Sequence, residues 1–291
     1  MRNYKIFTDS VSDLPLNLIR ELDLRVVSLK YEIGGKAYTE SINENRSQML
    51  AEFYSSLKMG ASSKTSLIPV GEFISEFQNY LEKDMDVLYI AFSSGLSGTY
   101  NSACLAAKEL EKQFPGNRVR VIDSLCASLG EGLLVYESVI RKREGMDIDS
   151  LEKWINNNKL RVCHLVLLED LKHLKTSGRI SFANELFGSL LGIRPIVKVD
   201  NEGKLIAYNK QRGRAKALDF IANEIRKTGD DISSQTIFIS YSQCKDEAVS
   251  FGEKIKSDLG VKGFLCNEIG TVIGSHAGCG VIAVFFFGKK R

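Results

Sequence analysis

Residues Ser93 to Thr99 form a short segment, SSGLSGT, whose residue types suit the binding of an anion. The segment contains three serines, two glycines and one threonine, and it follows the apolar run 87–92. Hydroxyl groups are neutral hydrogen-bond donors, and glycines let backbone N–H groups approach a ligand closely. A loop of this kind before a helix can hold an anion, although it can also be an ordinary turn.

Two more polar clusters follow predicted strands, at 8–10 and at 123–124. Parallel strands would bring these clusters to one edge of a sheet, where open α/β sheets bind ligands. We interpret Asp9 and Asp123 themselves as turn or N-cap residues, because aspartate is common in both settings. Another polar segment, Lys64–Ser66, precedes a helix that we expect to begin near Gly71.

His276 is one of three histidines, and it lies in the glycine-rich segment GSHAGCG. It could donate a hydrogen bond to a ligand or, when protonated, supply a positive charge. A purely structural role is the alternative for His276, and it is our interpretation of His164, which lies inside an apolar run.

Several catalytic and nucleotide-binding motifs are absent from the sequence. Neither GxxxxGK[ST] nor GxGxxG occurs. The stretch Gly95–Thr99 lacks the final glycine of the nucleophile elbow GxSxG, so Ser97 is a poor candidate nucleophile. A small-molecule hydrolase or transferase that uses Ser94 or Ser97 with His276 stays open as an alternative, although no acid clearly orients the histidine.

The first part of the chain alternates predicted strands and helices, which favours a parallel sheet covered by helices. Strands are expected at 4–8, 24–29, 87–92 and 119–122, and helices at 46–58, 71–81, 103–114 and 129–141.

The second part predicts a smaller α/β domain with a mixed sheet, because a hairpin signal, DNEG at 200–203, joins two of its strands. Strands are expected at 165–168, 196–199, 205–209, 236–241 and 281–287, and helices at 215–226 and 247–259. A polar stretch near 156–159 places the domain boundary, giving domains 1–158 and 159–291.

Composition excludes several classes of protein. The 291 residues are 44% hydrophobic and 26% charged, as in soluble globular proteins. The net charge of +3 is too small to indicate nucleic-acid binding. The apolar run 281–287 is far shorter than the roughly 20 residues of a membrane helix. The six cysteines lack zinc-site spacing, and we expect reduced thiols in a cytoplasmic protein. The closing Gly288–Arg291 is expected to be a solvated tail.

Eight motifs in order resemble the DegV family of bacterial fatty-acid-binding proteins. They are TDSVSDLP (8–15), KTSLIPVGEF (64–73), SSGLSGTYNSA (93–103), VIDSLCASLGEGLLV (121–135), DLKHLKTSGRIS (170–181), IRPIV (193–197), KQRGRAKAL (210–218) and GTVIGSHAGCGVIAV (270–284). Together they cover nearly the whole chain, and the resemblance implies two α/β domains, the first with a parallel sheet.

The resemblance also implies a ligand and a partner. The ligand is a long-chain fatty acid whose carboxylate lies near the domain interface. The expected carboxylate-binding residues are Thr65, Ser66, Ser93, Ser94, Ser97 and His276. The partner is a separate kinase, similar to dihydroxyacetone kinases, that uses ATP to convert the carboxylate to an acyl-phosphate. The chain itself is then expected to carry its substrate without catalysing the reaction and to need no metal or cofactor.

The sequence departs from the family pattern at two positions. Pro69 stands one place later than the family's proline, and Cys279 replaces a proline in the GxHxGPG motif.

Four arginines in the second domain have two possible roles. They are either separate solvated side chains, or a docking face for the kinase or a charge clamp near the phosphate: Arg179, Arg194, Arg212 and Arg214.

Overall fold

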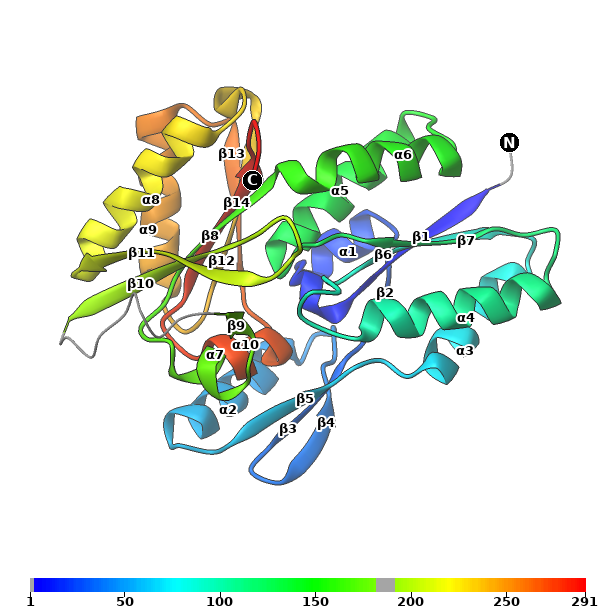
Figure 1. Ribbon diagram of the computed structural model, residues 1–291, viewed down its shortest axis with the longest axis horizontal. Helices are drawn as coiled ribbons and strands as arrows, with labels where there is room; N and C mark the ends of the chain where they lie inside the picture. Colours follow the sequence, from blue (N-terminus) through cyan, green and yellow to red (C-terminus); the bar gives the residue numbers. More distant parts are fainter. Residues whose placement is uncertain (1–2, 182–191) are drawn as a thin grey trace.

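The computed structural model describes residues 3–181 and 192–291. In these residues three β-sheets are present, and Figure 1 shows the two larger ones side by side with the small third sheet below them. The predicted combination of a parallel and a mixed sheet is confirmed.

The first sheet is wholly parallel, in the strand order β2-β1-β6-β7. Its strands are β1 (Tyr4–Asp9), β2 (Arg25–Val27), β6 (Asp86–Ala91) and β7 (Val119–Asp123). Alternate residues of β6 face opposite helical layers, with Tyr89 on one side and Leu88 on the other. One layer contains α3 (Val70–Leu81) and α4 (Thr99–Gln113). The other contains α1 (Leu16–Glu21), α5 (Leu129–Arg143) and α6 (Ile148–Asn158), and a 3-10 turn, η1 (Ser10–Ser12), follows β1.

The small sheet is antiparallel, in the order β4-β3-β5, and it was not predicted from the sequence. It consists of β3 (Lys30–Ile33), β4 (Lys36–Thr39) and β5 (Ser63–Ser66). The polar segment Lys64–Ser66 is therefore an extended strand. The helix α2 (Arg46–Lys58) connects β4 to β5, and its bounds are those predicted.

The mixed sheet has seven strands, in the order β13-β12-β14-β8-β10-β11-β9. They are β8 (Val162–Leu167), β9 (Ile180–Ser181), β10 (Ile193–Val199), β11 (Leu205–Arg212), β12 (Thr236–Tyr241), β13 (Gly263–Glu268) and β14 (Ile282–Phe287). One face is covered by α8 (Arg214–Thr228) and α9 (Lys245–Leu259). The predicted hairpin between β10 and β11 is confirmed.

The opposite face of the mixed sheet packs against the first part of the chain. Helix α5 contacts β8, β12 and β14, so one apolar cluster includes Leu133 as well as Phe285. Two short helices, α7 (Lys172–Thr176) and α10 (Thr271–Ala277), lie between this face and the small sheet (Figure 1).

Residue 158, the predicted domain boundary, is the last residue of α6. It is followed by the 3-10 turn η2 (Lys159–Arg161), and a third 3-10 turn, η3 (Ile232–Ser234), precedes β12. Because the apolar core continues across this position, the two-domain division stays a prediction. Across residues 3–181 and 192–291 no helix has the length and apolar character needed to cross a membrane.

Candidate functional site

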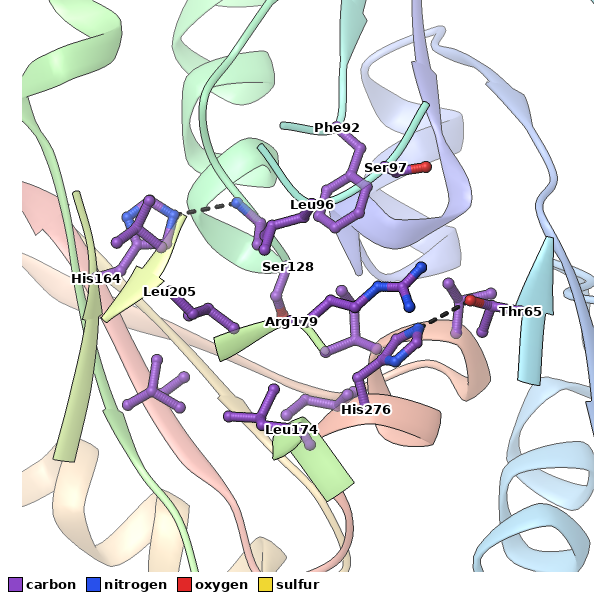
Figure 2. A pocket seen from close by; sticks show the side chains of 18 of the residues that line it. Thr65, Phe92, Leu96, Ser97, Ser128, His164, Leu174, Arg179, Leu205 and His276 are labelled. Atoms are coloured by element: carbon purple, nitrogen blue, oxygen red, sulfur yellow. Dashed lines mark hydrogen bonds between the residues drawn. The ribbon is translucent and has the colours of Figure 1, made fainter. Parts of the chain in front are cut away.

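A cavity of about 410 Å³ lies between the mixed sheet and the first part of the chain. This volume is within the range of about 300–1,000 Å³ that is typical of small-molecule sites. Its lining comes from β5, the loop before α4, the loop after β7, α7, α10 and the inner face of the mixed sheet (Figure 2). Most of the lining side chains are aliphatic or aromatic, so the cavity suits an apolar ligand.

Polar groups gather on one side of this cavity, where β5 meets α10. Thr65 Oγ1 and His276 Nε2 are 2.8 Å apart and share a hydrogen bond, although the residues are separated by 211 positions in the chain. Burial lowers the pKa of His276 to about 4, and the charges of Arg179 and His173 add to the effect. The imidazole is therefore neutral near pH 7. Its Nδ1 atom is buried and has no hydrogen-bond partner among the described residues.

Arg179 is the only charged side chain among the described residues that line the cavity. Figure 2 shows its guanidinium on the same side as Thr65 and His276. Ser66 and Ser97 also line the cavity, and Ser97 Oγ lies 2.9 Å from Thr99 Oγ1. Without a lining carboxylate in the described part of the chain, this side of the cavity has a positive electrostatic character.

The start of α10 is fixed by buried carboxylates from the first part of the chain. The backbone N–H of Gly270 donates to Asp13 Oδ1 (2.8 Å), and Thr271 Oγ1 donates to Glu40 Oε1 (3.0 Å). One turn later, Gly274 packs against α2 so closely that an added Cβ would lie 2.6 Å from the Tyr54 hydroxyl. These contacts set the position of His276 on the same helix.

The buried position of Asp13 disfavours the charged form of its carboxyl group. Its carboxylate is fully buried and accepts hydrogen bonds from Arg46 (3.2 Å) and Ser128 (2.6 Å). Burial raises the pKa of Asp13 to about 7, although the Arg46 guanidinium opposes the shift. Asp9, also fully buried, has its pKa raised to about 6 for the same reason.

Ser93, unlike Ser97, makes contact with the β10–β11 turn. Its hydroxyl donates to the carbonyl oxygen of Gly203 (2.8 Å) and accepts from the backbone N–H of Gly95 (3.1 Å). Gly203 has φ +75°, and an added Cβ there would lie 2.1 Å from Ser93 Oγ. Ser93 and the exposed Ser94 do not line the cavity, so their predicted contact with a carboxylate stays a prediction.

The aspartates at the ends of β1 and β7 act as turn residues, as interpreted from the sequence. Asp9 accepts from the backbone N–H of Val11 and caps η1. Asp123 accepts from the backbone N–H groups of Ser94 and Leu125, both at 3.1 Å.

Three further polar lining residues were not predicted: Ser128, His164 and Ser240. The expected structural role of His164 is confirmed by its burial and by hydrogen bonds at both ring nitrogens. Its contribution to the cavity depends on the packing of β8 against the loop after β7, which no local sequence pattern specifies.

The four candidate arginines differ in their surroundings. Arg194 and Arg214 both pair with Glu169, at 3.0 and 2.6 Å, and Arg214 also pairs with Glu247. Arg212 is exposed on β11, and Arg179 lies at the cavity. Two of the four charges are thus already neutralised within the chain.

The expectation that the chain ends in a wholly solvated tail is wrong for its last residue. The Arg291 guanidinium donates to the carbonyl oxygens of Val162 (3.0 Å), Leu125 (2.8 Å) and Asp200 (2.9 Å). It therefore joins β8, the loop after β7 and the β10–β11 turn.

The geometry does not support a serine nucleophile activated by His276. The hydrogen-bond partner of His276 is Thr65, and that of Ser97 is Thr99. A nucleophile and its base must lie within hydrogen-bond reach, with a third group orienting the base. In the described residues His276 Nδ1 has no such third group.

Comparisons with known proteins agree with this architecture. The family model described as "Uncharacterised protein, DegV family" matches residues 3–289. A DegV domain-containing protein of Clostridium perfringens is 38% identical over 291 residues, covering 100% of this chain and 99% of the relative. A DegV domain-containing protein of Lactococcus lactis is 32% identical and covers 99% of this chain and 98% of its own.

Solved structures of fatty-acid-binding proteins are also similar. A DegV family protein from Thermus thermophilus, described by its fatty acid binding, has a TM-score of 0.88 and 31% identity, with 99% of this chain and 100% of that chain covered. DegV of Bacillus subtilis, described as a fatty acid binding protein, has a TM-score of 0.84 and 26% identity, with the same coverage. The chain belongs to the DegV family.

Proposed function

We propose that this protein binds a long-chain fatty acid in the cavity between its two large sheets. The observation that carries the proposal is the distribution of chemistry in that cavity, which is apolar along the mixed sheet and has Thr65, His276 and Arg179 together on one side. Its relatives of similar structure that are described as fatty-acid-binding proteins support the same ligand class.

The two ends of a fatty acid make opposite demands. Each buried methylene contributes about 0.8 kcal/mol, so the tail supplies most of the affinity. An unpaired buried carboxylate would cancel much of this gain. The Arg179 guanidinium can donate hydrogen bonds to the carboxylate and compensates its charge. Because Thr65 and the neutral His276 ring share a hydrogen bond, one of the two, either the Thr65 hydroxyl or a His276 N–H, supplies a further donor at a time. Ser66 and Ser97, which also line the cavity, are further candidate donors.

We further propose that the protein presents the bound carboxylate to a separate ATP-dependent kinase. A carboxylate oxygen would attack the γ-phosphoryl group of ATP, with ADP as the leaving group and an acyl-phosphate as the product. ATP and Mg²⁺ would be bound by the kinase. Arg179 and Arg212 are the candidate docking or charge-clamp residues, since Arg194 and Arg214 are already paired with Glu169.

Fatty acid binding is tested by extracting the protein, purified from a bacterial host, with organic solvent and identifying acyl chains by mass spectrometry. We expect near-stoichiometric fatty acid in the wild type. A Ser94→Ala variant tests the predicted contact of the serine-rich loop, and less bound fatty acid would support it. An empty extract together with no uptake of added palmitic or oleic acid would refute the proposal.

The division of labour with a kinase requires a separate test. Loaded protein is incubated with ATP and Mg²⁺, with and without a purified dihydroxyacetone-kinase-like fatty acid kinase, and acyl-phosphate is trapped with hydroxylamine. Product should appear only when the kinase is present. Product formed by the chain alone would make it an enzyme and overturn this part of the proposal.

A further inference from the structure

The mixed sheet contains an opening between two neighbouring strands. Strands β8 and β10 pair at Leu167 with Ile196 and at Val166 with Val197, and directly after β8 the backbone N–H of Leu168 donates to the carbonyl oxygen of Pro195 (3.0 Å). β8 nevertheless stays paired with β14 along its whole length, and β10 stays paired with β11 as far as Val199. The two strands therefore separate over residues 162–165 of β8 and 198–199 of β10, and we call this opening the seam.

A second cavity, of about 370 Å³, lies behind the seam. Its lining includes Cys163 and Leu165 of β8, Lys198 of β10 and Tyr208 of β11. Successive residues of a strand point to opposite faces of the sheet. The side chains of Cys163, Leu165, Lys198 and Tyr208 therefore lie on the α8 side, away from the main cavity. Two residues, His164 and Val199, line both cavities. They form the partition between the two spaces.

His164 is held rigidly in this partition. Its Nε2 atom accepts from the backbone N–H of Ala127 (3.2 Å), and its Nδ1–H donates to the carbonyl oxygen of Val162 (3.1 Å). The edge of the ring meets Phe285, and an added Cβ on Gly130 would lie 2.2 Å from Nε2. Burial lowers the pKa of His164 well below its ordinary value, so the imidazole is neutral. A neutral ring with both nitrogens satisfied can adjoin a hydrocarbon without leaving an unpaired polar group.

The width of the seam is fixed at its outer end. Arg291 donates to Val162 of β8 and to Asp200 at the end of β10, so one side chain bridges the two separated strands. Figure 2 shows His164 on the opposite side of the main cavity from Thr65 and His276. A ligand with its carboxylate at Thr65 and His276 would therefore direct its other end toward the seam.

We propose that His164 and Val199 set the upper limit on the length of the acyl chain. The inference rests on the proposed function, because it concerns the methyl end of the same ligand. A chain that fills the main cavity ends against the partition, and a longer chain has to fold back or leave methylenes in water. Opening the partition would give the chain access to the second cavity, where Leu165 and Phe286 offer apolar surface. The charged side chains of the same lining, Lys198, Glu224, Lys227, Lys289, Lys290 and Arg291, limit how many further methylenes can be buried there.

The matched pair of variants is Val199→Ala and Val197→Ala. Both valines lie on β10, both are buried and both face the main cavity, but only Val199 also lines the second cavity. His164→Ala is a stronger opening of the partition, checked by circular dichroism because it removes the acceptor of the Ala127 N–H. Saturated fatty acids from myristic to behenic acid are titrated against each protein by displacement of a fluorescent fatty acid.

We expect Val199→Ala to shift the preferred acid to a longer chain, because each additional buried methylene tightens binding about fourfold. Arachidic acid should bind at least tenfold more tightly to Val199→Ala than to the wild type, while palmitic acid changes less than threefold. Val197→Ala should change all affinities without moving the preferred length.

Two outcomes would refute the role of the partition in chain length while leaving fatty acid binding intact. One is a shift of equal size in Val197→Ala. The other is an unchanged preference for chain length in Val199→Ala when the wild type binds normally. Failure of the wild type to bind any acid in the series would refute the proposed function, and this inference with it.

Discussion

The contact between Ser93 and the β10–β11 turn is expected to stabilise the junction of the two sheets, and Ser93→Ala removes it. The hydroxyl is fully buried and serves two backbone groups, the Gly203 carbonyl and the Gly95 N–H. Gly203 is 110 positions away in the sequence, so the bond joins segments that meet only in the folded protein.

The magnitude follows from the groups left behind. A buried donor or acceptor without its partner costs about 1–3 kcal/mol. Two such groups are affected, but the turn carries the exposed Glu202, and water can reach part of this region after truncation. We therefore expect Ser93→Ala to lower the free energy of unfolding by about 2–3 kcal/mol.

The measurement is equilibrium unfolding in urea, followed by circular dichroism and by the fluorescence of Trp154, the only tryptophan of the chain. Ser94→Ala is the control, because it makes the same substitution at the neighbouring, exposed serine. Its free energy of unfolding should stay within about 0.5 kcal/mol of the wild type. Equal losses in the two variants, or a loss below about 0.5 kcal/mol for Ser93→Ala, would refute the assigned role of this hydroxyl.

Three other predictions concern the carboxylate end and its support. Thr65→Val keeps the side-chain shape but removes the bond to His276, so palmitic acid affinity should fall about 5–20-fold in the displacement assay; unchanged affinity would exclude Thr65 from headgroup binding. Because His276 has a pKa of about 4 when folded, against an ordinary 6.5, the unfolded chain takes up its proton first and stability falls as the pH drops through this range. Between pH 7.5 and pH 5 the free energy of unfolding of the wild type should therefore fall by about 1–2 kcal/mol more than that of His276→Gln. Asp9 and Asp13, whose pKa values are raised, have the opposite effect on stability, but they are present in both proteins and cancel in the difference. Arg46→Leu leaves Asp13 buried without its cation and should lower the free energy of unfolding by about 3–5 kcal/mol at pH 7, with a smaller loss near pH 5, where Asp13 binds a proton; a loss independent of pH would contradict the pairing.

Local patterns in the sequence predicted most elements because each depends on its own hydrophobic period. The bounds of α2 and β12 agree with prediction, and the parallel pairing of β1, β6 and β7 follows from the strand–helix alternation. The small sheet was missed although a signal was present, since Gly34 and Gly35, both with positive φ, form a tight turn between β3 and β4.

The site was less predictable, because its residues meet through tertiary packing. His276 was selected by its glycine-rich segment and Thr65 by a polar segment and the family resemblance, but nothing in their own surroundings indicates that they share a hydrogen bond. His164 and Ser240 gave no signal, because a buried strand residue looks the same whether it faces a cavity or a helix. The prediction for Arg291 was wrong because most of its partners are backbone carbonyls, which every residue carries and no sequence pattern identifies.

The hydrogen bond between Asp13 and Gly270 has a consequence for the order of synthesis. The two residues are 257 positions apart, and translation at about 5–20 residues per second separates their appearance by roughly 10–50 s. During that interval the Asp13 and Glu40 carboxylates lack the hydrogen bonds that the start of α10 donates to them in the finished protein. The nascent first sheet must keep this polar cluster hydrated until α10 is made, so this contact between the two parts of the fold forms only after residue 270 has been synthesised.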